Sequence, residues 1–95
     1  MRTVIGRFVA RPGQCDALRR VFDELLGPTL AEPGCLRYEV FVRVDRPDEF
    51  VTVEHWRDAA AVESHMLSAH VARAFERGGP LLAAAPEIVA YERVA

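Results

Sequence analysis

A chain of 95 residues has room for one domain, residues 1–95, and a domain this small hides only about 60–65% of its unfolded surface, so its own core gives modest stability. The net charge of −2 lacks the clustered positive charge that nucleic acid requires, and no apolar run approaches the roughly 20 residues of a membrane span. We therefore expect no nucleic acid and no membrane among its partners, and the 51% hydrophobic content predicts an additional buried surface between subunits.

The first residues enter a strand-like pattern directly, without the long apolar core or the cleavage motif of a signal peptide. A cytoplasmic protein is the expectation. Cys15 and Cys35 lack the spacing of a metal site, and we expect both to be free thiols in a reducing compartment.

The first half of the chain predicts a strand followed by a helix. Residues 3–11 carry the strand pattern and Pro12-Gly13 closes it. Apolar residues then recur at the spacing of one helix face, at Leu18, Val21, Phe22, Leu25 and Leu26. Gly27-Pro28 is expected to interrupt this helix.

A hairpin is predicted next, with strands at 35–44 and 50–56 joined by a turn at Asp45-Arg46-Pro47-Asp48. Both faces of these strands are partly apolar. Asp58 and Ser68 are each placed to cap a short helix, and Gly78-Gly79-Pro80 ends the second one. Residues 88–94 read as the last strand.

The resulting order, βαββαβ, predicts a ferredoxin-like α+β fold, an antiparallel sheet with its helices on one face. Apolar residues on the other face would be left in water unless a second copy covered them. We therefore expect a homodimer that packs sheet to sheet.

All three histidines and the only tryptophan fall between residues 54 and 70. His65 and His70 are five residues apart, about 140° around one continuous helix, so they converge only if the chain changes direction near Ser68. The chain has no His-x-x-x-His metalloprotease pattern and no Cys beside a His at metal spacing, and it has no nucleophile elbow and no glycine-rich phosphate loop. We expect no metal, flavin or nicotinamide cofactor.

A small apolar pocket with a few ionisable side chains remains, and such a pocket suits proton abstraction from an acidic organic substrate. Imidazole, with an unperturbed pKa of about 6.5, is the natural base at neutral pH. The residues expected to set the size of the pocket are Phe22, Leu25, Met66 and Phe75.

Three motifs then suggest a family. Tyr38 follows the turn Glu32-Pro33-Gly34-Cys35, and Glu54-x-Trp56 is followed by His65 and then His70. From Val4 to about Val94 the chain resembles the antibiotic biosynthesis monooxygenase family of dimeric α+β barrels. The resemblance implies oxidation of an aromatic polyketide, quinol or anthrone by O2 without metal or cofactor, the deprotonated aromatic supplying the electrons.

On this interpretation His65 or His70 is the base, and Glu54 or Tyr38 orients it. Arg7 is the best candidate to stabilise an anionic oxygen. The expected catalytic residues are therefore His65, His70 and Glu54, and the expected substrate-binding residues are Arg7, Tyr38, Trp56, Phe22, Met66 and Phe75. His55 has the opposite strand parity and is expected to face the partner or solvent.

Each of these residues also has a structural explanation. Trp56 and Tyr38 are suited to filling the core, Glu54 to capping a helix or pairing with an arginine, and Arg7 to a simple salt bridge. His70 sits where it would serve only the first turn of its helix.

Other activities of the same fold stay open. An isomerase or cyclase would use the same histidine as acid and base, and a ligand-binding or stress-associated module would have no turnover. A haem-degrading branch of the superfamily uses an Asn, a Trp and a His, and those places here hold Arg7, His65 and Phe75, which disfavours haem degradation.

Overall fold

The computed structural model describes residues 1–95. The elements follow the predicted order, with a short 3₁₀ turn, η1, after the last helix. In chain order they are β1 (Arg2–Val9), α1 (Cys15–Leu30), β2 (Cys35–Arg43), β3 (Arg46–Trp56), α2 (Ala59–Met66), α3 (Ala69–Gly78), η1 (Gly79–Leu81) and β4 (Glu87–Tyr91).

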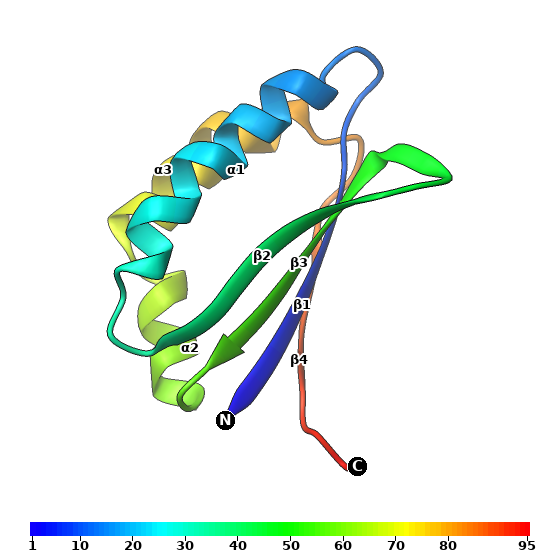
Figure 1. The fold of residues 1–95 in the computed structure, drawn as a ribbon. Helices are drawn as coiled ribbons and strands as arrows, with labels where there is room; N and C mark the ends of the chain where they lie inside the picture. The colour runs from blue at the N-terminus through cyan, green and yellow to red at the C-terminus, as the bar shows by residue number, and fades with distance from the viewer.

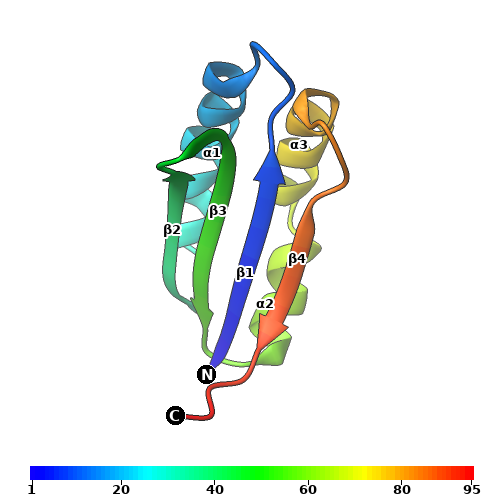
Figure 2. The same ribbon diagram turned by 90° about the vertical axis from the view of Figure 1, so that its right-hand side faces the viewer.

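The four strands form one antiparallel sheet in the order β2-β3-β1-β4. All three helices cover one face of it (Figure 1), and the other face is open to view in Figure 2. This confirms the ferredoxin-like α+β fold. None of the helices is both long and apolar enough to cross a lipid bilayer.

The core lies between the helices and the covered face of the sheet. Alternate strand residues point into it, because successive side chains of a strand face opposite ways. Its buried apolar members are Val4, Ala10, Leu18, Phe22, Leu25, Tyr38, Phe50, Trp56, Ala61, Val71 and Leu82. Trp56 is fully buried at the end of β3.

The predicted interruption at Gly27-Pro28 is wrong. α1 continues through both residues to Leu30, and Pro28 lies within its last turn. A proline in the last turn removes one backbone donor, but the preceding turns of α1 keep their hydrogen bonds and their packing. The backbone N–H of Ala31 still closes the helix on the carbonyl of Gly27, at 3.2 Å.

The hairpin turn is also tighter than expected. It consists of Val44 and Asp45, and β3 starts at Arg46 with Pro47 inside it. A register shift after Val42 accommodates this geometry. β1 and β4 are likewise shorter than the ranges 3–11 and 88–94 that the pattern predicted.

The two predicted helix caps are confirmed. The side chain of Asp58 accepts a hydrogen bond from the backbone N–H of Ala61 at 2.8 Å, and Ser68 accepts one from Val71 at 3.3 Å. Ser68 also donates its hydroxyl to the carbonyl of His65 at 2.6 Å. The chain therefore stops one helix and starts the next within two residues, Leu67 and Ser68.

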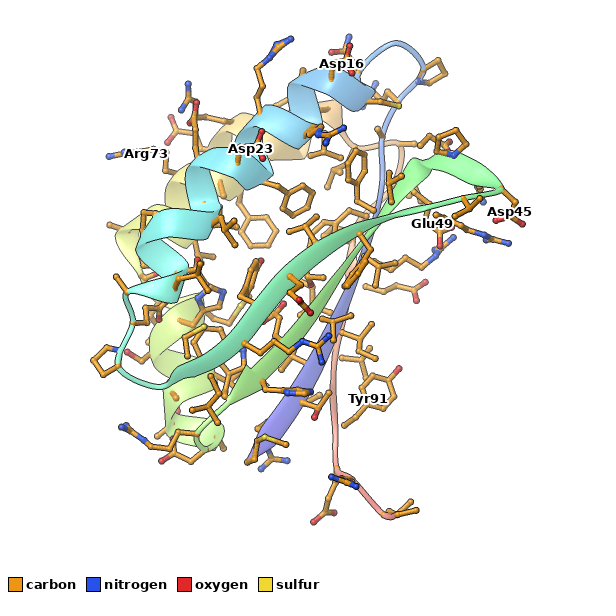
Figure 3. All side chains as sticks on the ribbon, viewed as in Figure 1. Asp16, Asp23, Asp45, Glu49, Arg73 and Tyr91 are labelled. Carbon is orange, nitrogen blue, oxygen red and sulfur yellow. The ribbon has the colours of Figure 1, made fainter.

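The open face of the sheet combines apolar and charged residues. Ile5, Phe41, Val89 and Tyr91 are exposed there, and Ile5 lies between Val53 and Val89 on the neighbouring strands. Figure 3 shows Glu49 and Tyr91 on the side of the sheet away from the helices. Such a face is typical of a surface that a second copy covers.

Candidate active site

Three side chains from separate segments meet at one carboxylate oxygen. Glu32 lies in the connection between α1 and β2, His65 at the end of α2, and His70 in the first turn of α3. The Oε2 atom of Glu32 lies 2.6 Å from Nδ1 of His65 and 2.8 Å from Nε2 of His70. The change of direction at Ser68 is what brings the two histidines together, as the spacing argument required.

The arrangement fixes which nitrogen of each histidine carries a proton. An ionised carboxylate only accepts hydrogen bonds, so both nitrogens that face Glu32 must be donors. Neutral His65 is then protonated on Nδ1, and its Nε2 atom keeps a free lone pair. A partly buried carboxylate that orients an imidazole in this way leaves the other nitrogen able to accept a proton.

The connection that carries Glu32 is held tightly against α2. A Cβ atom built on Gly34 would lie 2.4 Å from the Cβ of Ala61, so only glycine fits this approach. The backbone N–H of Arg57 also donates to the carbonyl of Gly34 at 2.8 Å. Glu32 lies two residues before Gly34, so this close contact with Ala61 holds it near α2, the helix that bears His65.

Glu54 is engaged in a second, separate network. It accepts the Thr52 hydroxyl at 2.8 Å and the Trp56 indole N–H at 2.9 Å, and Thr52 accepts the N–H of Gly6 at 3.1 Å. Glu54 is buried, with each of its oxygens taken by a donor from its own strand. The orienting partner of the histidines is thus Glu32, and neither Glu54 nor Tyr38 has that role.

His65 is packed between aromatic rings. Its ring centroid lies 4.5 Å from that of Trp56 and 5.8 Å from that of Tyr38. Only 3% of His65 is exposed. The ring is therefore held by its stacking partners as well as by Glu32.

A mostly apolar cavity opens beside His65, between the covered sheet face and helices α1 and α3. It holds about 550 Å³ of empty space, counting its mouth. Its polar wall is made of Tyr38, Glu54 and His65. Its apolar wall includes three of the predicted substrate-binding residues, Phe22, Met66 and Phe75.

The Tyr38 hydroxyl remains protonated. Burial, reinforced by the nearby charge of Glu54, raises the pKa of Tyr38 well above its usual value. At neutral pH this phenol is a hydrogen-bond donor in the cavity wall. It is suited to holding an anionic oxygen rather than to removing a proton.

Cys35 is also held in its neutral form. Burial and the charge of Glu32 raise the pKa of this thiol. Cys15 and Cys35 are both free, in agreement with the sequence-based expectation.

Three predicted site residues do not line the cavity. Arg7 lies on the open face, where it pairs with Glu49 at 3.0 Å and approaches Glu87 at 3.9 Å, so its assignment as the anion-stabilising residue of this pocket is wrong. Trp56 lies behind His65 and has no exposed surface. His70 lies on the far side of Glu32 from the cavity, next to a surface hollow.

Sequence reasoning missed Glu32 as a functional residue. The residue was noted only as the start of the Glu-Pro-Gly-Cys turn, and nothing in the spacing connects it to His65, which comes 33 residues later. The available signal was an acidic side chain beside a proline and a glycine in a short, sharply bent connection.

Chemically, the cavity combines a buried imidazole, a neutral phenol and apolar walls. These groups are suited to a flat, weakly acidic molecule, because an imidazole can accept a proton and a phenol can donate a hydrogen bond to an anion.

Comparisons with known proteins show the family of the chain. A family model described as "Antibiotic biosynthesis monooxygenase" matches residues 1–77. The chain belongs to this family.

The chain is similar to Rv0793 of Mycobacterium tuberculosis, which is 37% identical over 79 residues that cover 83% of this chain and 77% of that protein. The structure of Rv0793 matches with a TM-score of 0.93 at 31% identity, over 99% of this chain and 95% of the other. PA3566 from Pseudomonas aeruginosa matches with a TM-score of 0.88 at 36% identity, over 99% and 94% of the two chains.

Proposed function

We propose that this member of the family is a cofactor-independent monooxygenase that oxidises a reduced aromatic substrate of the polyketide, quinol or anthrone type with O2. The observation that carries the proposal is His65, which is buried in the cavity wall with its Nδ1 atom bound by Glu32 and its Nε2 atom free. Family membership supports the oxygenase reaction over other proton-transfer reactions.

The reaction needs little from the protein beyond a proton acceptor and a dry pocket. For an anthrone, Nε2 of His65 takes a proton from the ring CH₂ group, and the resulting anion passes electrons to O2. One oxygen atom becomes the new carbonyl oxygen. The other leaves as water, with the second hydrogen of the carbon and the proton returned by His65.

The remaining cavity residues have supporting roles in the proposal. The Tyr38 hydroxyl donates to the substrate's anionic oxygen, and Phe22, Met66 and Phe75 exclude water from its rings. Glu54 contributes a fixed acceptor in the wall, because both of its oxygens are held by donors.

We also propose that the working form is a homodimer joined through the open sheet face. The exposed apolar residues of that face support this proposal. The unpaired cysteines suit a reducing compartment such as the cytoplasm.

The test is O2 consumption by metal-free protein with an anthrone or a dihydroxynaphthalene. Removal of a general base commonly lowers the rate by ~10²–10⁴, and we expect this loss for His65→Ala. His55→Ala is the matched control, because His55 lies on the opposite face of β3. Equal turnover in the wild type and in folded His65→Ala protein would overturn the assignment of the base.

The same assay separates the other activities of the fold. Product formed without O2 would indicate an isomerase or cyclase, and binding of the aromatic compound without any product would indicate a ligand-binding module. Either outcome contradicts the monooxygenase proposal.

A further inference from the structure

We infer that Glu32, His65 and His70 also form a binding site for a divalent transition-metal ion, and that filling this site disables His65 as a base. Two imidazoles and one carboxylate are the ligand set of many Fe(II), Zn(II) and related sites. The metal site itself follows from these three side chains alone, whereas the inhibition rests on the proposed function.

The three donor atoms are already gathered. They all lie within 4.8 Å of one another, and the Glu32 oxygen is 2.6 and 2.8 Å from the two nitrogens. Ligand atoms bound at about 2.1 Å on one face of an octahedral ion lie about 3 Å apart. Metal binding therefore requires mainly that the two nitrogens move closer together.

The most exposed member of the set is His70. Its side chain is 23% exposed, against 4% for His65 and 14% for Glu32. His70 also borders a surface hollow, which gives an ion a route from solvent. Arg73 and Arg77 line this hollow together with Glu24, and Glu24 pairs with Arg77. An ion entering here would meet His70 first and then the more buried pair of Glu32 and His65.

The charge of the site suits a cation. One carboxylate and two neutral imidazoles carry a net charge of −1, and each group offers a lone pair once its bridging proton has moved away. Both imidazole nitrogens already lie within hydrogen-bond distance of the same Glu32 oxygen, so the fold already holds the three groups together.

Occupancy changes the tautomer of His65. In the metal-free state the proton is on Nδ1 and the lone pair is on Nε2. A metal bound to Nδ1 displaces that proton to Nε2, because a neutral imidazole keeps one N–H. The nitrogen that faces substrate is then a donor, and it no longer accepts a proton.

Trp56 provides a direct readout of binding. It is the only tryptophan in the chain, and its ring centroid lies 4.5 Å from that of His65. An open-shell ion such as Co²⁺ bound beside His65 is expected to quench its emission. Tag-free protein would be titrated with CoCl₂ by fluorescence and with ZnCl₂ by calorimetry.

The wild type should show saturable quenching with one ion per chain. Glu32→Gln and His70→Ala should each weaken binding by at least the roughly 10–100-fold that even outer-shell partners contribute. His55→Ala should bind as the wild type does, and circular dichroism would confirm that each variant is folded. Absence of saturable quenching in the wild type, or equal affinities in folded His70→Ala and His55→Ala, would overturn the site.

The effect of the ion on turnover is measured in a separate experiment. Zn²⁺ at saturating concentration should abolish O2-dependent turnover, and a chelator should restore it. Full activity with the site occupied would overturn the inhibition and leave the metal site standing. If metal-free protein shows no turnover, the proposed function fails, and the binding titration still decides the metal site.

Discussion

In the proposed reaction His65 depends on Glu32. The carboxylate selects the Nδ1–H tautomer of this cavity-lining residue, and only that tautomer leaves a lone pair on Nε2. Because Glu32 also binds His70, it fixes the relative positions of α2 and α3 at the same point.

Replacing Glu32 by Gln should therefore lower kcat more than it changes KM. The amide NH₂ group can donate to Nδ1 and so favours the tautomer with its proton on Nε2, which is not a base. We expect a loss of kcat approaching the ~10²–10⁴ of a missing general base. Steady-state O2 consumption measures both constants.

Glu76→Gln is the matched control for this change. Glu76 is an exposed residue of α3, outside the lining of the cavity and away from the open face of the sheet. A folded Glu32→Gln protein with the kcat of the Glu76→Gln control would show that Glu32 does not position the base.

Much of the cavity wall could be predicted from the sequence. Tyr38, Glu54, His65, Phe22, Met66 and Phe75 all reach the cavity, because strand parity and helix spacing place them on the covered side. The prediction for Arg7 disagreed with the same parity rule. Arg7 alternates along β1 with the buried residues Val4 and Gly6, so it faces the open side of the sheet. Glu32 is a connection residue, and no periodic pattern indicates where such a side chain points.

At the scale of the elements, the site depends on two sharp changes of direction. One is the break at Ser68, which separates α2 from α3. The other is the connection around Gly34, which lies against Ala61 in α2 and carries Glu32. Both turns lie at the same end of the sheet, where β2 begins and β3 ends (Figure 1).

Gly34→Ala should destabilise the protein. The new methyl group would lie 2.4 Å from the Cβ of Ala61, so the connection or α2 must shift, and overpacking of this kind typically costs about 1–3 kcal/mol. The shift should also lower kcat, because it separates Glu32 from His65. Urea unfolding followed by circular dichroism gives the free energy.

Gly27→Ala is the companion variant. Apart from its chain neighbours, a Cβ atom at Gly27 meets nothing within 4 Å, and the residue lies inside α1 directly before Pro28. This change should alter the stability less than Gly34→Ala does, because the gain through the unfolded chain is opposed by the crowding of the new Cβ against the ring of Pro28. If both variants changed the free energy of unfolding equally, the close contact of Gly34 with Ala61 would make no special contribution to stability.

The type and order of the elements could be predicted, but some of their ends could not. Caps at Asp58 and Ser68 have local side-chain causes, so the sequence shows them. The continuation of α1 through Pro28 depends on packing against the rest of the fold, and the two-residue turn at Val44-Asp45 depends on a register shift. Such tertiary interactions leave no periodic pattern in the sequence.

At the scale of the whole molecule, the exposed apolar residues of the open sheet face predict a dimer. Light scattering at micromolar concentration should give twice the 10.6 kDa chain mass. Ile5→Glu should shift the mass toward the monomer, because it places a charge between Val53 and Val89. Leu67→Glu, at an exposed position between α2 and α3, should leave the dimer intact. A monomeric wild type would contradict the proposed assembly.

The charged cluster on the open face predicts a loss of stability in acid. Hydrogen bonding from Arg7 at 3.0 Å lowers the pKa of Glu49, and Arg43 at 3.4 Å adds to the effect. A lowered pKa contributes stability above the unfolded value of about 4.3, and this stability is lost as the pH falls through the folded value.

Glu49→Gln should therefore lower the melting temperature more at pH 7 than at pH 3. Thermal unfolding of both proteins at the two pH values measures the difference. An equal loss at pH 7 and pH 3 would mean that the ionised form of Glu49 has no part in stability.

The central claim is that His65 removes the substrate proton before O2 reacts. Rapid mixing of metal-free protein with an anthrone under anaerobic conditions, followed by O2, tests it most directly. The wild type should show the absorption band of the substrate anion before O2 is added, and the band should decay as the product forms. His65→Ala should show no such band and a much slower reaction. Product formation at the wild-type rate by folded His65→Ala protein, without the anion, would contradict the claim.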